Sequence, residues 1–145
     1  MGFIESVKTC FSKYFDFSGR ASRSEFWYFT LFLVIYIIIV GFTIGVVFEI
    51  RYPGTSEADI DYFFNSFGTF LFLPLIIPSF AVTSRRLHDF GHSGWIQIGF
   101  YFVMSISDAI NTDAGSVLYL VSLVLFYAYA SQKPVGENKY GAVIH

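Results

Sequence analysis

The stretch SRRLHDFGHSGW, residues 84–95, decides the fold because it places a dense group of charges between two apolar runs. Two arginines, two histidines and one aspartate fall within twelve residues, whereas only 14% of the whole chain is charged. The runs on either side, residues 62–84 and 93–107, contain no Asp, Glu, Lys, Arg or His. The pattern predicts a polar turn between two membrane helices, and it leaves open whether that turn is a site or only a turn.

The composition of the whole chain indicates a membrane protein. Hydrophobic residues make up 54% of the 145 residues, aromatic residues 21%, and the mean hydropathy is +0.57. A soluble domain carries about 25% charged residues, so this chain has too few charges to cover a water-exposed surface. Cys10 is the only cysteine, which excludes an intramolecular disulfide and a cysteine-rich metal site.

Four charge-free runs predict four membrane crossings. They cover residues 26–48, 62–84, 93–107 and 114–132. A helix needs about 20 apolar residues to cross the hydrocarbon core, and three of the runs meet that length. The third run has 15 residues, or about 22 Å of helix, so it must extend toward residue 112 or thin the bilayer. We therefore expect a single all-α integral membrane domain over residues 1–145, a four-transmembrane-helix bundle with spans at about 26–48, 65–84, 94–112 and 115–131.

The distribution of Lys and Arg predicts the orientation. The segment before the first span holds four of them, the loop with Arg85 and Arg86 two, and the tail of residues 132–145 two. The opposite side holds Arg51 alone. Because basic residues are retained on the cytoplasmic side, both termini are expected in the cytoplasm.

The first residues predict an amphipathic helix at the membrane surface. Over residues 3–15, apolar side chains such as Phe3, Val7 and Phe11 recur every three or four positions, and charged side chains occupy the other side. Such a helix lies in the interface rather than across the bilayer.

The segment SGRASRSEFW, residues 18–27, predicts the start of the first membrane helix. Ser22 and Glu25 have the spacing of a capping box, in which each side chain binds the backbone N–H of the other residue. Trp27 here, and Trp95 at the start of the third span, suit the membrane interface. Helix initiation and anchoring explain most of this segment, but not the two arginines that flank the cap, Arg20 and Arg23.

An antiparallel packing of the first two spans brings the two charged motifs to one membrane level. We then expect Glu25 to pair with an arginine of the later motif and Asp89 with an arginine of the earlier one, because unpaired carboxylates beside hydrocarbon are costly. Four arginines against two carboxylates leave positive charge for an anion such as a lipid headgroup. The competing interpretation is that Arg85 and Arg86 only fix orientation while Gly91 ends the helix.

Two sharper interpretations of the same stretch are weak. His88 and His92 are four residues apart and suit a shared metal, but Gly91 and Gly94 argue against a helix through them, so no metal and no cofactor are expected. The segment GHSGW is not a nucleophile elbow, because Trp95 stands where that motif needs glycine.

Three motifs resemble one protein family. GRASRSEFW, RRLHDFGHSGW and the tail segment ENKYG, in this order, are similar to the DUF805 family of small bacterial inner-membrane proteins. The resemblance implies a multi-pass helical protein of the bacterial cytoplasmic membrane. The third span here lacks the proline that family members often carry, which leaves the shape of that helix open.

The function expected from the sequence is binding of an anionic lipid headgroup or a partner protein at the cytoplasmic face. Membrane lipids, a second copy of the chain or another membrane protein are the expected partners, and nucleic acid is not. A small transporter or channel subunit is the alternative, followed by a membrane enzyme that uses His88 and Asp89 as an acid–base pair. The predicted binding cluster comprises Arg20, Arg23, Glu25, Arg85, Arg86, His88, Asp89 and His92.

Overall fold

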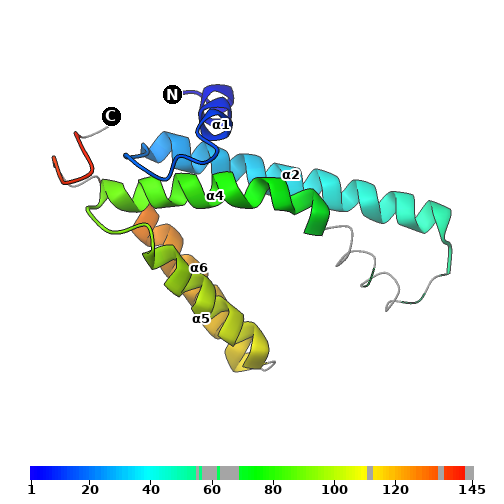
Figure 1. Cartoon of the computed structure of the whole chain (residues 1–145). Helices are drawn as coiled ribbons and strands as arrows, with labels where there is room; N and C mark the ends of the chain where they lie inside the picture. The colour runs from blue at the N-terminus through cyan, green and yellow to red at the C-terminus, as the bar shows by residue number, and fades with distance from the viewer. Residues whose placement is uncertain (55, 57–61, 63–68, 111–112, 134–135, 143–145) are drawn as a thin grey trace.

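The computed structural model describes residues 1–54, 56, 62, 69–110, 113–133 and 136–142, and in them the chain is helical (Figure 1). The helices are α1 (Phe3–Ser12), α2 (Arg23–Arg51), α4 (Thr69–Asp89), α5 (Ile96–Ile110) and α6 (Asp113–Ala130). The described residues contain no β-strand, only one isolated bridge between Asn138 and Gly141. The expected all-α fold is confirmed. The expected beginning of the second span, residues 65–68, lies outside the described residues.

The helices form two hairpins that meet at one end and diverge (Figure 1). Helices α2 and α4 lie side by side, α5 and α6 lie side by side, and α1 packs across the beginning of α2. The two hairpins are connected through the end of α4 and the beginning of α5. In the described residues the four long helices are therefore not packed along their whole length, which differs from the bundle that the sequence predicted. An apolar run predicts that a helix is removed from water. It does not distinguish a helix packed against other helices from one surrounded by lipid.

Helices α2 and α4 have the length and composition of membrane spans. The most apolar part of α2 has a mean hydropathy of 2.9, and only 6% of it is buried in the protein. In α4, with a mean hydropathy of 1.3, half of the corresponding part is buried. Large apolar side chains such as Ile38, Phe42 and Ile50 stand exposed along α2. A soluble protein would not expose a continuous surface of this kind, whereas lipid would cover it.

Pro74 and Pro78 lie inside α4 without ending it. Pro78 has no N–H to donate to the carbonyl one turn earlier, which is that of Pro74. The hydroxyl of Tyr14 donates to this Pro74 carbonyl oxygen at 2.6 Å. The segment after α1 thus satisfies the acceptor that the second proline frees, and holds α1 against α4.

The protein core is small and lies where the two hairpins meet. It consists of Cys10 from α1, Ala21 and Phe26 around the beginning of α2, Phe29, Val82 from α4 and Ala130 at the end of α6. Four separate segments of the chain converge on it. The charged motifs are attached to these same segments, so the core positions them against one another.

Candidate functional site

The end of α4 is fixed by a glycine turn. Gly91 has a φ of +76°, in the left-handed region that favours glycine. The N–H of His92 donates to the Leu87 carbonyl at 3.2 Å and the N–H of Gly91 donates to the His88 carbonyl at 2.9 Å. These two bonds form a Schellman motif, which satisfies the last carbonyls of a helix. The expected role of Gly91 as the helix end is confirmed, and the turn directs the chain back toward α5.

Asp89 lies between two buried arginines from different motifs. Its Oδ1 accepts from Arg20 Nε at 2.7 Å and lies 2.6 Å from Arg20 Nη2. Its Oδ2 accepts from Arg86 Nη1. All three side chains are at most 1% exposed. The expected pairing of Asp89 with an arginine of the earlier motif is confirmed.

The remaining N–H groups of these two arginines bind backbone carbonyls. Arg86 donates from Nε to the Ala130 carbonyl at 2.9 Å and from Nη2 to the Gln132 carbonyl at 2.7 Å. Arg20 Nη1 donates to the carbonyls of Gly136 and Gly141 at 3.1 and 2.9 Å. Each arginine therefore joins α4 to the end of α6 or to the tail, and its charge is directed into the protein.

A second buried pair holds α1 and α2 to α4. Arg85 Nη2 lies 3.0 Å from Glu25 Oε1, and the Cys10 thiol contacts the same oxygen at 3.8 Å. The expected pairing of Glu25 is confirmed as well. Burial, and then the neighbouring Glu25 carboxylate, raise the pKa of the Cys10 thiol to about 12, although Arg85 acts in the opposite direction. Arg85 Nη1 has no hydrogen-bond partner among the described residues.

The expected capping box forms only in part. Ser22 Oγ accepts from the Glu25 N–H at 3.1 Å, as expected for the first residue before a helix. The Glu25 carboxylate turns toward Arg85 instead of bonding back to Ser22. A buried guanidinium is a stronger partner for a carboxylate than a neutral backbone N–H, which explains the difference.

The structure brings together six of the eight residues in the predicted cluster. Arg20, Glu25, Arg85, Arg86, His88 and Asp89 are buried, whereas Arg23 and His92 are exposed. Both tryptophans expected at the interface, Trp27 and Trp95, are exposed. In the part of the chain that the structure describes, no group of three His, Cys, Asp or Glu side chains is placed to hold a metal.

His88 is not paired with Asp89. Its Nδ1 lies 3.0 Å from the Gly19 carbonyl oxygen, and its ring stacks on Tyr140 with 3.9 Å between centroids. Asn138 in the tail donates to the His88 carbonyl at 3.0 Å. Asp89 is occupied by Arg20 and Arg86, so the acid–base pair of the enzyme hypothesis is not formed in this geometry.

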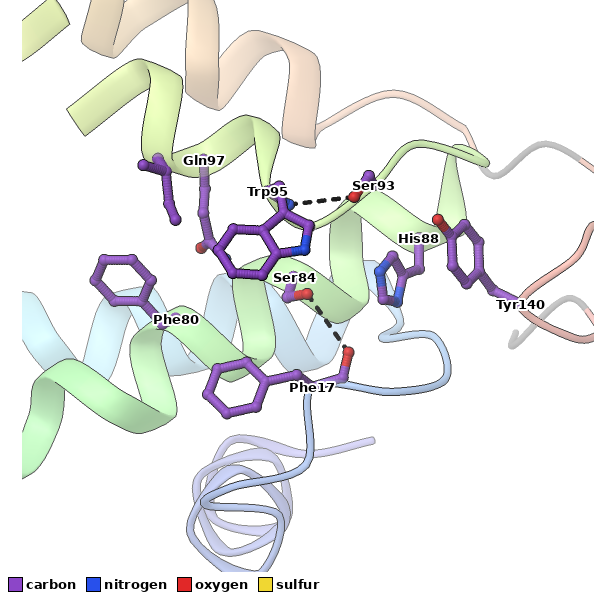
Figure 2. Close-up of a pocket in the computed structure, with 10 residues that line it drawn as sticks. Phe17, Phe80, Ser84, His88, Ser93, Trp95, Gln97 and Tyr140 are labelled. Carbon is purple, nitrogen blue, oxygen red and sulfur yellow. Dashed lines mark hydrogen bonds between the residues drawn. The ribbon is translucent and has the colours of Figure 1, made fainter. Parts of the chain in front are cut away.

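A cavity of about 600 Å³ opens beside this network, between the end of α4 and the beginning of α5 (Figure 2). One part of its lining is aromatic or aliphatic, and another part carries polar side chains from the same two helices and the turn between them. The residues are Phe17, Phe80, Ser84, His88, Ser93, Gly94, Trp95, Gln97, Ile98 and Tyr140. Of these, only His88 had been predicted as a cluster residue, with Trp95 expected as an anchor.

Two residues of the cavity lining, Gly94 and Ser84, approach each other closely. A Cβ added at Gly94 would lie 1.9 Å from Ser84 Oγ, 2.8 Å from its Cβ and 3.2 Å from its Cα. The last of these is backbone, so a side-chain rotation does not relieve the contact. Only glycine allows the turn to cross α4 at this distance.

One uncharged residue in the sequence could have indicated the cavity. Gln97 is the only amide side chain in the charge-free run of residues 93–107, and it is 4% exposed in the structure. A buried polar residue within an apolar span is commonly a functional one. Apart from the Asp89 carboxylate, the acceptors of Arg20 and Arg86 are backbone carbonyls, for which a sequence has no marker.

Comparison with known proteins places the chain in a family. The family described as "Protein of unknown function (DUF805)" matches residues 14–142. Inner membrane protein YhaI of Escherichia coli (strain K12) is 30% identical over 128 residues, 88% of this chain and 85% of that protein. Inner membrane protein YhaH of the same strain is 34% identical over 82 residues, 57% of this chain and 60% of that protein. No solved structure matches the chain. The matched region includes both charged motifs and the tail residues that hydrogen-bond to them. The chain belongs to the DUF805 family of inner-membrane proteins.

Proposed function

We propose that this protein is a four-crossing inner-membrane protein that binds a membrane lipid in the cavity between α4 and α5, with both termini in the cytoplasm. The observation that carries the proposal is the cavity itself, which combines apolar and polar lining at the level of the charged motifs. The arginine network acts in this proposal as the framework that holds the cavity open.

The proposed crossings rest on the exposed apolar helices and on the distribution of basic residues. Helix α2, with 29 residues, is about 43 Å long and exceeds the hydrocarbon thickness, while α5, with 15, is about 22 Å long. A hairpin as short as α5 and α6 would cross where the bilayer is thinned or the helices are tilted. The polar junction of the two hairpins would then lie at the cytoplasmic surface.

The lining of the cavity suits an amphipathic ligand. Phe80 and Ile98 offer apolar contact for an acyl chain, and Ser84, His88 and Gln97 offer polar contact for a headgroup. Trp95 is 77% exposed at the same place, where an aromatic ring suits the interface between headgroups and chains. A ligand with one apolar and one polar end would satisfy both parts of the lining.

The test is lipid retention by a variant whose cavity is filled. Ile98→Trp places an indole in the cavity, and Ile96→Trp places one on the same helix outside the lining. Native mass spectrometry of gently purified protein should show lipid bound to the parent and to Ile96→Trp and absent from Ile98→Trp. Equal retention by both variants would overturn the proposal, and loss of a bound protein instead of a lipid would assign the cavity to a partner.

The orientation has its own test. Cysteines are introduced separately at Ser56, in the loop after α2, and at Ser131, after α6, with Cys10 replaced by alanine. An impermeant thiol reagent added to intact cells should label the first and not the second. Equal labelling at both positions would contradict four crossings with a cytoplasmic tail.

A further inference from the structure

One hydrogen-bond acceptor in the polar part of the cavity lining has no donor. Gln97 Oε1 is fully buried and has no hydrogen-bond partner among the described residues. A buried acceptor without a donor costs free energy, because it has lost its hydrogen bonds to water without replacing them. Gln97 lines the cavity, so a ligand there is the group best placed to supply the missing donor (Figure 2).

Two neighbouring side chains have their hydrogens directed elsewhere. Ser84 Oγ donates to the Phe17 carbonyl at 3.4 Å, which leaves lone pairs as its remaining hydrogen-bonding capacity. Because a carbonyl oxygen only accepts, the contact between His88 and the Gly19 carbonyl is a hydrogen bond when Nδ1 carries the proton. The other ring nitrogen of a neutral His88 is then an acceptor.

The lining contains no cation that would attract an anion. No Lys or Arg is among the described residues that line the cavity. Arg85 and Arg86, which follow Ser84 in the sequence, are paired with Glu25 and Asp89. Lys139, which precedes Tyr140, has its Nζ 4.9 Å from the centroid of the Tyr140 ring. Three acceptors in a lining without Lys or Arg suit a ligand that carries hydrogen-bond donors.

We propose that the cavity selects lipids whose headgroup carries N–H or O–H donors, such as a primary ammonium or a hydroxyl. Gln97 Oε1 is the atom that accepts their hydrogen bond. This inference rests on the proposed lipid binding and adds to it the chemistry of the headgroup. The selection is by hydrogen bonding and not by net charge.

The experiment compares two pairs of lipids, each pair matched in charge. Phosphatidylethanolamine and phosphatidylcholine are both zwitterionic, but only the first has N–H donors. Phosphatidylglycerol and phosphatidylmethanol are both anionic, but only the first has hydroxyl donors. Lipid-free protein in detergent is titrated with each lipid and bound lipid is counted by native mass spectrometry. The donor-bearing member of each pair should bind about fivefold more tightly, the effect of roughly one hydrogen bond.

Substitution of Gln97 makes the test specific. Gln97→Met keeps the length of the side chain and removes the acceptor, so it should abolish the preference in both pairs while retaining binding of phosphatidylcholine and phosphatidylmethanol. Gln132→Met, at an exposed position outside the cavity, should leave the preference intact.

The possible outcomes separate this inference from the proposed function. Equal binding within each pair, with Ile98→Trp still blocking all four lipids, would overturn donor selection and keep lipid binding. An order set by net charge would also overturn it. If Ile98→Trp changes nothing, the proposed function fails and the inference with it. Displacement of lipid by equally low concentrations of free glycerol would assign the cavity to a soluble polyol and overturn the lipid assignment.

Discussion

The last two turns of α4 present two faces that differ in how their polar groups are satisfied. On one face, Arg86 and Asp89 are bonded on several sides by other parts of the chain. On the other, Ser84 and His88 line an open cavity together with Gln97, whose Oε1 has no hydrogen-bond partner among the described residues. The charged face attracts attention in the sequence, yet its groups are occupied within the protein. The less conspicuous face has hydrogen-bonding capacity to offer to a ligand.

Loss of Asp89 is the change expected to have the largest effect on the charged face. Asp89→Ala leaves Arg20 and Arg86 buried beside each other without their shared carboxylate. Removal of one partner from a buried ion pair costs about 3 to 5 kcal/mol. We expect a large drop in the midpoint of thermal unfolding in detergent. Glu137→Gln, an exposed carboxylate in the tail, serves as the control and should leave the midpoint unchanged. A parent-like midpoint for Asp89→Ala would show that the network does not hold the hairpins together.

A side chain added at Gly94 should have the next largest effect, and it should alter both faces of α4. Gly94→Ala forces the chain away from Ser84, at a cost of about 1 to 3 kcal/mol for overpacking, and should also reduce lipid retention. Gly99→Ala is the matched control, because nothing lies within 4 Å of the added carbon. Ser84→Gly in the same chain removes the clashing Cβ and hydroxyl and should restore part of the stability. No rescue by that second substitution would mean that the close approach is not the cause.

Replacement of Arg86 by lysine should have a smaller effect on stability. It tests whether Arg86 is needed for its hydrogen bonds within the protein or only for the orientation of the chain in the membrane. The three nitrogens of Arg86 reach Asp89, Ala130 and Gln132, and a lysine ammonium cannot reach all three. Arg86→Lys should therefore lower the unfolding free energy by about 1 to 3 kcal/mol, the cost of buried acceptors left without donors. Arg23→Lys, at an exposed position, should be neutral, since orientation depends on positive charge alone. Equal stability of both variants with the parent would make Arg86 a topology anchor only.

The sequence was informative where a physical requirement has a residue type as its marker. Charge-free runs marked the helices, Gly91 marked the end of α4, and the cost of buried carboxylates predicted the pairs of Glu25 and Asp89. It was uninformative about backbone acceptors. The carbonyls of Gly136 and Gly141, which bind Arg20, leave no trace in the residue type, so the sequence did not show that this arginine is bonded to the tail.

The divergence of the two hairpins and the cavity between α4 and α5 escaped the sequence for a different reason. Both depend on how elements separated in the chain approach each other. Gly94 allows that approach, and Gln97 lines the cavity beside it. Neither position stands out in the sequence until Ser84 is placed beside the turn.

The smallest expected effect comes from a comparison of cysteine reactivity at a buried ion pair and in the cavity. Cys10 is fully buried against Glu25, and burial raises the pKa of its thiol to about 12, so little reactive thiolate is present at neutral pH. Ser93 lines the cavity and is partly exposed, so a cysteine there is accessible to reagent. In the variant Ser93→Cys, a soluble maleimide should modify residue 93 rapidly and Cys10 only after unfolding, as peptide mass mapping of the product would show. Bound lipid should slow the reaction at residue 93 and leave Cys10 unaffected. Rapid modification of Cys10 in folded protein would mean that the buried pair of Glu25 and Arg85 opens to solvent, and the contrast between closed ion pairs and an open cavity would be lost.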